Sequence, residues 1–195
     1  MNTLAKSRPA AQAPKTPIEI SVEDYFAMEM NSPKRHESVD GVVYAKTGAR
    51  DRHNLVSGDI FAKFWAQLPR RCQVFMTDMK LRVRIDTKTR FYYPDVMVSC
   101  SEVDRQEYFR EQPVFIAEVL SPTTERTDRG EKFEAYKRID SLEDYLIAHQ
   151  DVARIELFRR KTGWTREVFA AGQSFTLASV DLTLAVDDIY RRVEF

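Results

Sequence analysis

The spacing of hydrophobic residues along the chain indicates two helices in its first third. In the segment 53–68 apolar residues recur every four positions, which predicts an amphipathic helix that Pro69 ends. An earlier helix is predicted to begin at Ser21, whose hydroxyl can accept from a free amide of the first turn, and to run to about Asn31.

Most of the remaining pattern is that of strands. The alternation in 81–85, the polar turn at 86–89 and the apolar run 91–100 predict a hairpin with one polar face. The segment 114–120 is apolar except for Glu118 and predicts a central, buried strand. We further expect two short strands around Asp40-Gly41, strands at 145–148, 154–158 and 164–169, and helical segments at 128–138 and 187–190.

The composition is that of one globular domain, which we place at 18–195. Of the 195 residues, 43% are hydrophobic and 11% aromatic, which excludes a disordered chain. Residues 1–17 contain three prolines and no acidic residue, which predicts a flexible tail. The 30 basic and 30 acidic residues cancel, so net charge does not favour a protein that coats nucleic acid, although the sum leaves room for a local basic patch.

Cysteine content and hydropathy favour a cytoplasmic protein without a membrane anchor. Cys72 and Cys100 are too few for a disulfide framework or a four-ligand zinc site. No apolar run approaches the roughly 20 residues that span a bilayer. The histidines do not have the spacing of a metal site, and we expect His53 to begin a helix or to make a hydrogen bond.

Two acidic residues interrupt apolar strands and are the most informative anomaly. Asp95 lies in the segment 92–98, and Glu118 lies in the segment 115–120. A buried, unpaired carboxylate costs several kcal/mol, so a fold that contains one usually supplies a cation or hydrogen-bond donors. Two such residues on neighbouring strands suit Mg²⁺ or Mn²⁺. Alternatively, Asp95 is a strand-entry residue that binds a loop amide.

A lysine on the following helix completes the pattern. If Phe133 and Tyr136 pack on the sheet, Lys132 can reach the end of the strand that carries Glu118. Its ammonium could orient an attacking water and neutralise charge on a phosphate. Alternatively, Glu118 and Lys132 form a buried ion pair that only fixes the helix to the sheet.

These motifs resemble those of known nucleases. Pro94-Asp95, then Glu118 on a second strand, then a lysine resemble the PD-(D/E)XK nuclease superfamily. More specifically, the segment from about Ser21 to Arg160 resembles the Uma-two endonuclease family of bacterial proteins. The motifs that carry this resemblance are Glu-Ser-Val-Asp-Gly at 37–41, Tyr-Pro-Asp-Val-Met-Val at 93–98, Glu-Val-Leu-Ser-Pro-Thr-Thr at 118–124, and Asp128, Lys132 and Tyr136.

The resemblance implies an α/β (α+β) restriction endonuclease-like fold, with a central mixed sheet flanked by helices. It implies that Asp95 and Glu118 bind Mg²⁺ or Mn²⁺ and that Lys132 assists the attacking water. The superfamily usually places this lysine two residues after the acidic residue, where this chain has Leu120, whereas the Uma-type pattern places it on the next helix. Glu37 matches an acidic position that in related nucleases can bind a metal-bound water.

The expected partner is DNA, which the chain would cut as a metal-dependent endonuclease. Lys80, Arg82 and Arg84 share one face of the predicted hairpin and are candidate phosphate contacts. Alternatively, these charges only protect a solvated edge strand. A non-catalytic binding or assembly protein with the same fold is the alternative function. Edge strands and the segment 164–169 offer surfaces for a homodimer.

Overall fold

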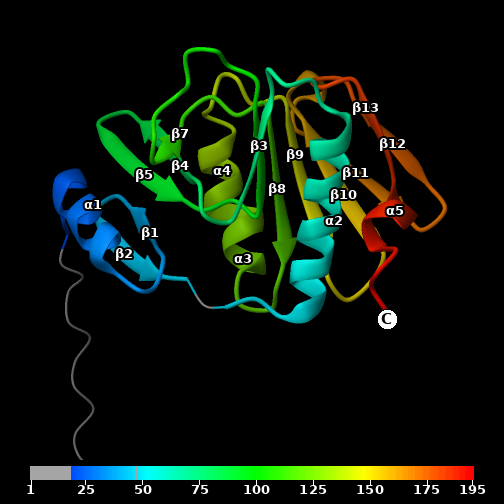
Figure 1. Ribbon diagram of the computed structural model, residues 1–195, viewed down its shortest axis with the longest axis horizontal. Helices are drawn as coiled ribbons and strands as arrows, with labels where there is room; N and C mark the ends of the chain where they lie inside the picture. Colours follow the sequence, from blue (N-terminus) through cyan, green and yellow to red (C-terminus); the bar gives the residue numbers. More distant parts are fainter. Residues whose placement is uncertain (1–18, 47) are drawn as a thin grey trace, which may run out of the picture.

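The computed structural model describes residues 19–46 and 48–195. The predicted tail at 1–17 lies outside the described residues. Within them the chain forms two large sheets, a separate two-stranded hairpin and helices that cover the sheets (Figure 1). The predicted fold class is confirmed, because the strands form mixed sheets flanked by helices.

A six-stranded sheet forms the centre of the fold. Its strand between β6 and β9 is β8, which is parallel to β9, while the other neighbours pair antiparallel. Every residue of β8 is buried, as the apolar run around Glu118 predicted. In spatial order the strands are β11 (Arg166–Ala170), β10 (Arg154–Arg159), β9 (Asp144–His149), β8 (Phe115–Leu120), β6 (Val96–Ser99) and β3 (Gln73–Met76).

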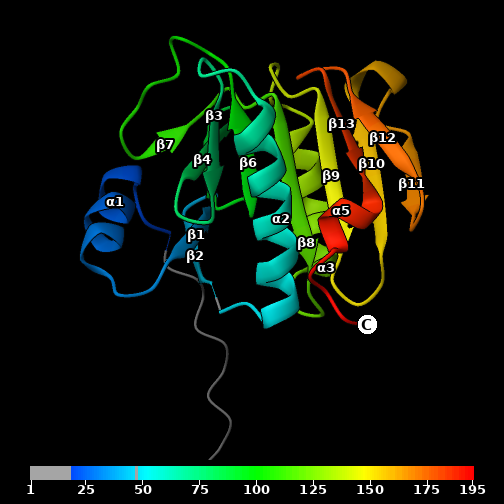
Figure 2. The same cartoon turned by 45° about the vertical axis from the view of Figure 1, so that its right-hand side comes forward.

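Helices cover both faces of this sheet (Figure 2). On one face α2 (Asp51–Gln67) buries Val56, Ile60 and Phe64 in the larger core, as its four-residue spacing predicted. The same face also carries α5 (Val186–Tyr190), β12 (Ser174–Leu177) and β13 (Leu182–Ala185), and the other face carries α3 (Glu125–Thr127), the π-helix η1 (Asp128–Lys132) and α4 (Phe133–Tyr136).

The described residues include no helix that is both long and apolar enough to cross a membrane.

A second, five-stranded sheet lies beside α1 (Val22–Asn31), whose cap Ser21 accepts from the Asp24 amide as predicted. The predicted turn at Asp40-Gly41 is confirmed, with φ of 53° and 88° at the two residues. In spatial order the strands are β2 (Val42–Ala45), β1 (His36–Val39), β5 (Lys88–Tyr92), β4 (Lys80–Ile85) and β7 (Phe109–Arg110).

The predicted strand at 91–100 is wrong in one respect, because the chain changes sheets in its middle. β5 ends at Tyr92 in the five-stranded sheet, and β6 begins at Val96 in the six-stranded sheet. Pro94 lies in the gap and has no amide to donate to a ladder. The break therefore places Asp95 at the corner where the two sheets meet.

Two further segments differ from the sequence prediction. The predicted helix at 128–138 is a chain of short helical segments that begins with a π turn at Asp128–Lys132. The hairpin formed by β12 and β13 was not predicted, because it contains few of the β-branched and aromatic runs that mark strands.

The two cysteines form one disulfide, a pairing that their number alone did not predict. Cys72 precedes β3 and Cys100 follows β6, and the two strands pair antiparallel with Gln73 opposite Ser99. The bond therefore joins neighbouring strands of the six-stranded sheet, at the end of β6 opposite to Asp95.

Replacing both cysteines with serine is expected to lower the free energy of unfolding by about 3 kcal/mol. The bridge joins residues 28 positions apart, and opening a loop of that size increases the entropy of the unfolded chain. Urea unfolding of the variant, and of the wild type with and without a reductant, measures the effect. Detection of two reactive thiols in the folded, unreduced protein would contradict the pairing.

Candidate active site

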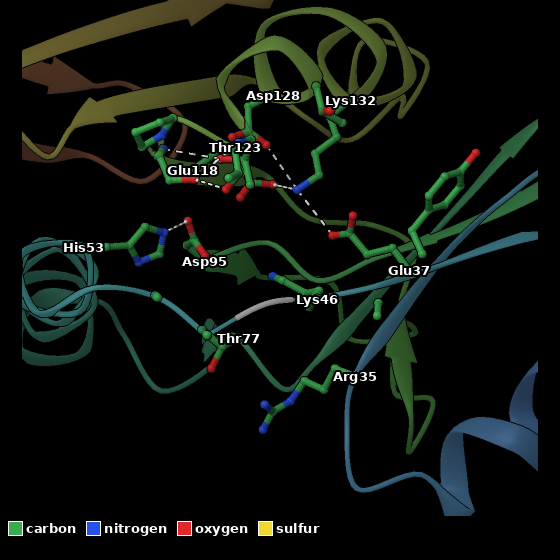
Figure 3. Close-up of a pocket in the computed structure, with 18 of the residues that line it drawn as sticks. Arg35, Glu37, Lys46, His53, Thr77, Asp95, Glu118, Thr123, Asp128 and Lys132 are labelled. Atoms are coloured by element: carbon green, nitrogen blue, oxygen red, sulfur yellow. Dashed lines mark hydrogen bonds and ion pairs between the residues drawn. The ribbon is translucent and has the colours of Figure 1, made fainter. Parts of the chain in front are cut away.

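A cleft of about 990 Å³ opens where the two sheets meet, and it contains all four residues that were predicted to be catalytic. Glu37 comes from β1, Asp95 from the corner before β6, Glu118 from β8 and Lys132 from η1 (Figure 3). Segments separated by more than 90 positions in the sequence thus supply one site.

The strand register places Asp95 and Glu118 side by side. Val96 of β6 lies opposite Ala117 of β8, so the register continued by one residue puts Asp95 opposite Glu118. Residues in opposite positions have their side chains on the same face of the sheet. The Val119 amide also donates to Asp95 Oδ2 at 2.8 Å, so Asp95 does bind a backbone amide, but the amide belongs to the neighbouring strand.

His53 is the second partner of the Asp95 carboxylate. It lies in the first turn of α2, and its Nε2 is 3.1 Å from Asp95 Oδ2. Burial raises the pKa of Asp95, but His53, the Lys46 ammonium and the Val119 amide together outweigh it and hold that pKa below its ordinary value. His53 makes the hydrogen bond expected from the sequence, although its partner could not be read from sequence because α2 covers the opposite face of the sheet.

Lys132 lies among three carboxylates. Its Nζ is 3.1 Å from Glu118 Oε1, 3.3 Å from Glu37 Oε1 and 3.2 Å from Asp128 Oδ1. Only 4% of its side chain is exposed. Burial lowers the pKa of Lys132, but the three carboxylates more than compensate and raise it well above its ordinary value. Lys132 is therefore a permanent cation at the centre of the cluster.

The π turn of η1 directs both Asp128 and Lys132 into the cleft. A π turn is wider than an α turn and is frequent at functional sites, and here its first and last residues are the buried ones. The intervening Glu131 points to the five-stranded sheet, where it accepts from Arg90 Nη1 at 2.9 Å and from the Tyr92 hydroxyl. Asp128 belongs to the recognised motif, but sequence reasoning did not place it in the site.

The cluster carries more negative than positive charge. Burial raises the pKa of the Glu118 carboxyl to about 8. Lys132 opposes this rise, and the carboxylates of Asp128 and Asp95 add to it. Burial also raises the pKa of Asp128. Three carboxylates thus surround one buried ammonium, with Asp95 beside them, and an additional cation would relieve their repulsion.

The donor set fits a hard divalent ion. Asp95 Oδ2 accepts from His53 and Val119, and Glu118 Oε1 accepts from Lys132 and from the Tyr136 hydroxyl at 2.8 Å. In the described residues the second oxygens, Asp95 Oδ1 and Glu118 Oε2, have no hydrogen-bond partner. Although no three His, Cys, Asp or Glu side chains in this part of the chain are placed to hold an ion, Mg²⁺ accepts two carboxylates with water and substrate oxygens.

The basic residues predicted to contact DNA lie away from the cleft. Lys80 lies over the rings of Tyr93 and Phe26, with its Nζ 5.1 and 5.8 Å from their centroids. Arg82 and Arg84 both pair with Glu111, at 2.7 and 3.3 Å. The three residues are on β4 as expected, but they do not line the cleft.

Comparison with known proteins identifies the family of this chain. Residues 22–187 match the model of Uma2, described as a putative restriction endonuclease. The chain belongs to the Uma2 family. The resemblance read from its motifs is thereby confirmed, and the matched range includes all four predicted catalytic residues of this Uma2 protein.

Similar proteins cover most of this Uma2 chain. The uncharacterized protein slr1290 of Synechocystis sp. (strain ATCC 27184 / PCC 6803 / Kazusa) is 33% identical over 95% of this chain and 99% of its own. The uncharacterized protein sll1609 of the same strain is 27% identical over 72% and 81%. A crystal structure of a putative nuclease belonging to DUF820 from Anabaena variabilis ATCC 29413 superposes with a TM-score of 0.69 at 16% identity, covering 88% of this chain and 98% of its own. That likeness shows that the two share a fold.

Metal-free protein is expected to lose stability as the pH rises from about 5 to about 8. A carboxyl whose pKa is higher in the folded than in the unfolded chain binds a proton on folding, so the free energy of unfolding falls between its two pKa values, here 4.5 and about 8. The slope contributed by Glu118 is at most about 1.4 kcal/mol per pH unit. Urea unfolding in EDTA at pH 5 and pH 8 measures it.

The matched control for this dependence is Glu118→Gln, which keeps the shape of the side chain and removes the titrating group. In the variant, the free energy of unfolding is expected to fall much less between pH 5 and pH 8 than in the wild type. An equal decline in variant and wild type would contradict the assignment to Glu118.

Proposed function

We propose that this Uma2 protein is a divalent-metal-dependent endonuclease that hydrolyses phosphodiester bonds in DNA. The family description supports a hydrolase of the nuclease type. The observation that carries the proposal is the pair of opposed, buried carboxylates, Asp95 and Glu118, each with one oxygen free at the cleft. The side chains are 8% and 3% exposed, so neither is solvated as a surface acid would be.

Asp95 and Glu118 are the residues that would hold Mg²⁺ or Mn²⁺. When bound there, the ion would lower the pKa of a water and neutralise charge that develops on a phosphate. The protein orients the ligands beforehand: His53 and the Val119 amide fix Asp95, and Lys132 with Tyr136 fixes Glu118.

The chain's own residues supply the remaining requirements. Glu37 accepts from the Tyr93 amide at 3.1 Å and lies 3.3 Å from Lys132, both through Oε1, so its carboxylate is held in place at the cleft wall. Its position suits a group that orients the attacking water. Lys132, on the helix where the Uma-type pattern has its lysine, holds Glu37 and Glu118 at a fixed separation.

The alternative of a non-catalytic protein also requires the buried pair of Glu118 and Lys132, which the structure contains. A purely structural ion pair, however, needs no second carboxylate opposite Glu118 and no cleft beside it. The presence of Asp95, with His53 as its partner, favours the catalytic proposal.

Asp95→Asn is expected to weaken Mn²⁺ binding at least tenfold and to abolish DNA cleavage, because an amide oxygen is a poorer ligand than a carboxylate. Calorimetric titration with Mn²⁺ and a plasmid-nicking assay measure the two effects. The matched control is Asp144→Asn, another buried acid, which is paired with Arg159 and lies outside the cleft. Equal Mn²⁺ affinity in wild type and Asp95→Asn would refute the metal site.

His53→Leu is expected to lower Mn²⁺ affinity roughly 10-fold or more, because the Asp95 carboxylate loses the partner that orients it. His53→Gln, which can still donate a hydrogen bond, should recover part of the affinity. The same titration reports both variants, and thermal unfolding separates lost orientation from lost folding. If His53→Leu and His53→Gln have the same Mn²⁺ affinity as each other, the hydrogen bond from His53 has no positioning role.

A further inference from the structure

The cleft has an acidic floor and a basic mouth. Its floor is formed by the carboxylates around Lys132, whereas Lys34, Arg35, Arg50 and Arg126 line its mouth with exposed side chains. Arg50 is the cap of α2, and Arg126 lies on α3, which is on the opposite face of the six-stranded sheet from α2. Two elements that are remote in the sequence thus present cations to the same opening.

Among the exposed arginines in the described part of the chain that have no carboxylate partner, Arg50 and Arg126 are the two that line the cleft. In the described part of the chain neither makes an ion pair, whereas Arg35 pairs with Asp78. On the β4 hairpin, Arg82 and Arg84 share Glu111. Glu111 therefore offsets part of the charge of the two hairpin arginines, while Arg50 and Arg126 at the cleft mouth remain available to an anion.

Lys46 places a third cation deeper in the cleft, on the wall nearest to Asp95 (Figure 3). Its Nζ donates to the Tyr93 carbonyl at 2.8 Å, which fixes the ammonium but uses one of its three protons. Lys132, by contrast, is surrounded by three carboxylates and almost fully buried. Lys46, unlike Lys132, can therefore contact a substrate.

We propose that Lys46, Arg50 and Arg126 bind the phosphates of a nucleic acid strand that crosses the cleft, with Lys46 on the phosphate next to the Asp95 and Glu118 pair. The inference rests on the proposed function for the identity of the substrate. The acidic floor repels phosphate, so binding requires cations at the mouth. Arginine suits two-pronged contact with backbone phosphate, and the compact ammonium of Lys46 suits a single oxygen.

The first test is DNA binding without cleavage. Fluorescence anisotropy measures the affinity of a labelled 20-base-pair duplex over a range of salt concentrations, once in EDTA and once in Ca²⁺. The double variant Arg50→Gln/Arg126→Gln is expected to bind at least 10-fold more weakly and to lower the salt slope by about 0.9 for each phosphate that the variant no longer neutralises. The matched control, Arg82→Gln/Arg84→Gln, also removes two arginines and is expected to bind as the wild type does.

The second test separates Lys46 from the arginines. Where the wild type cleaves DNA, Lys46→Gln should lower kcat by 10-fold or more and Lys46→Arg should recover part of it, whereas the arginine variants should mainly raise KM. Thermal unfolding checks that Lys46→Gln, which loses a bond to Tyr93, still folds.

The outcomes distinguish this inference from the proposed function. Binding that depends on Arg50 and Arg126 without any cleavage supports the phosphate contacts and refutes the nuclease. Cleavage that is unaffected by the cleft variants, or weakened by the hairpin control instead, refutes the contacts and leaves the nuclease standing. No duplex binding in either buffer overturns the inference. The inference is also overturned if an unlabelled mononucleotide competes for binding as strongly as an unlabelled duplex does, because the site would then bind a small molecule.

Discussion

The ammonium of Lys132 is the group on which the arrangement of the cleft depends. It contacts Glu37 of the five-stranded sheet, Glu118 of the six-stranded sheet and Asp128 of its own π turn. One cation thus pairs with acids from three separate elements, β1, β8 and η1. Without it, several carboxylates would be buried beside one another with no compensating charge, an arrangement that a fold avoids.

The same concentration of acids explains why the cleft divides into zones of opposite charge. A site that gathers carboxylates for a divalent ion repels the polyanion on which that ion would act. In the proposed function, the cations Arg50 and Arg126 at the edge of the cleft would bind the phosphates that the acids repel. A net charge of zero for the whole chain is compatible with this pattern, because both charges are local.

The sequence predicted those features that depend on residues close together along the chain. Asp95 and Glu118 were recognisable because charge inside an apolar strand is anomalous, and Lys132 because it follows at a motif distance. The partners of these residues depend on packing between distant segments, so the bond from His53 to Asp95 was not predictable. The hairpin cations show the converse: Arg82 and Arg84 do share a face, but Glu111, which pairs with both, comes from a segment more than 25 positions away.

The corner at Tyr93–Asp95 has one more consequence. A residue inside a strand bonds its amide and carbonyl to neighbouring strands, but Tyr93 lies between the end of β5 and the start of β6. Its amide is therefore free to hold the Glu37 carboxylate, and its carbonyl is free to hold the Lys46 ammonium. Because the strand is interrupted here, the main-chain groups of Tyr93 fix two side chains of opposite charge on the wall of the cleft.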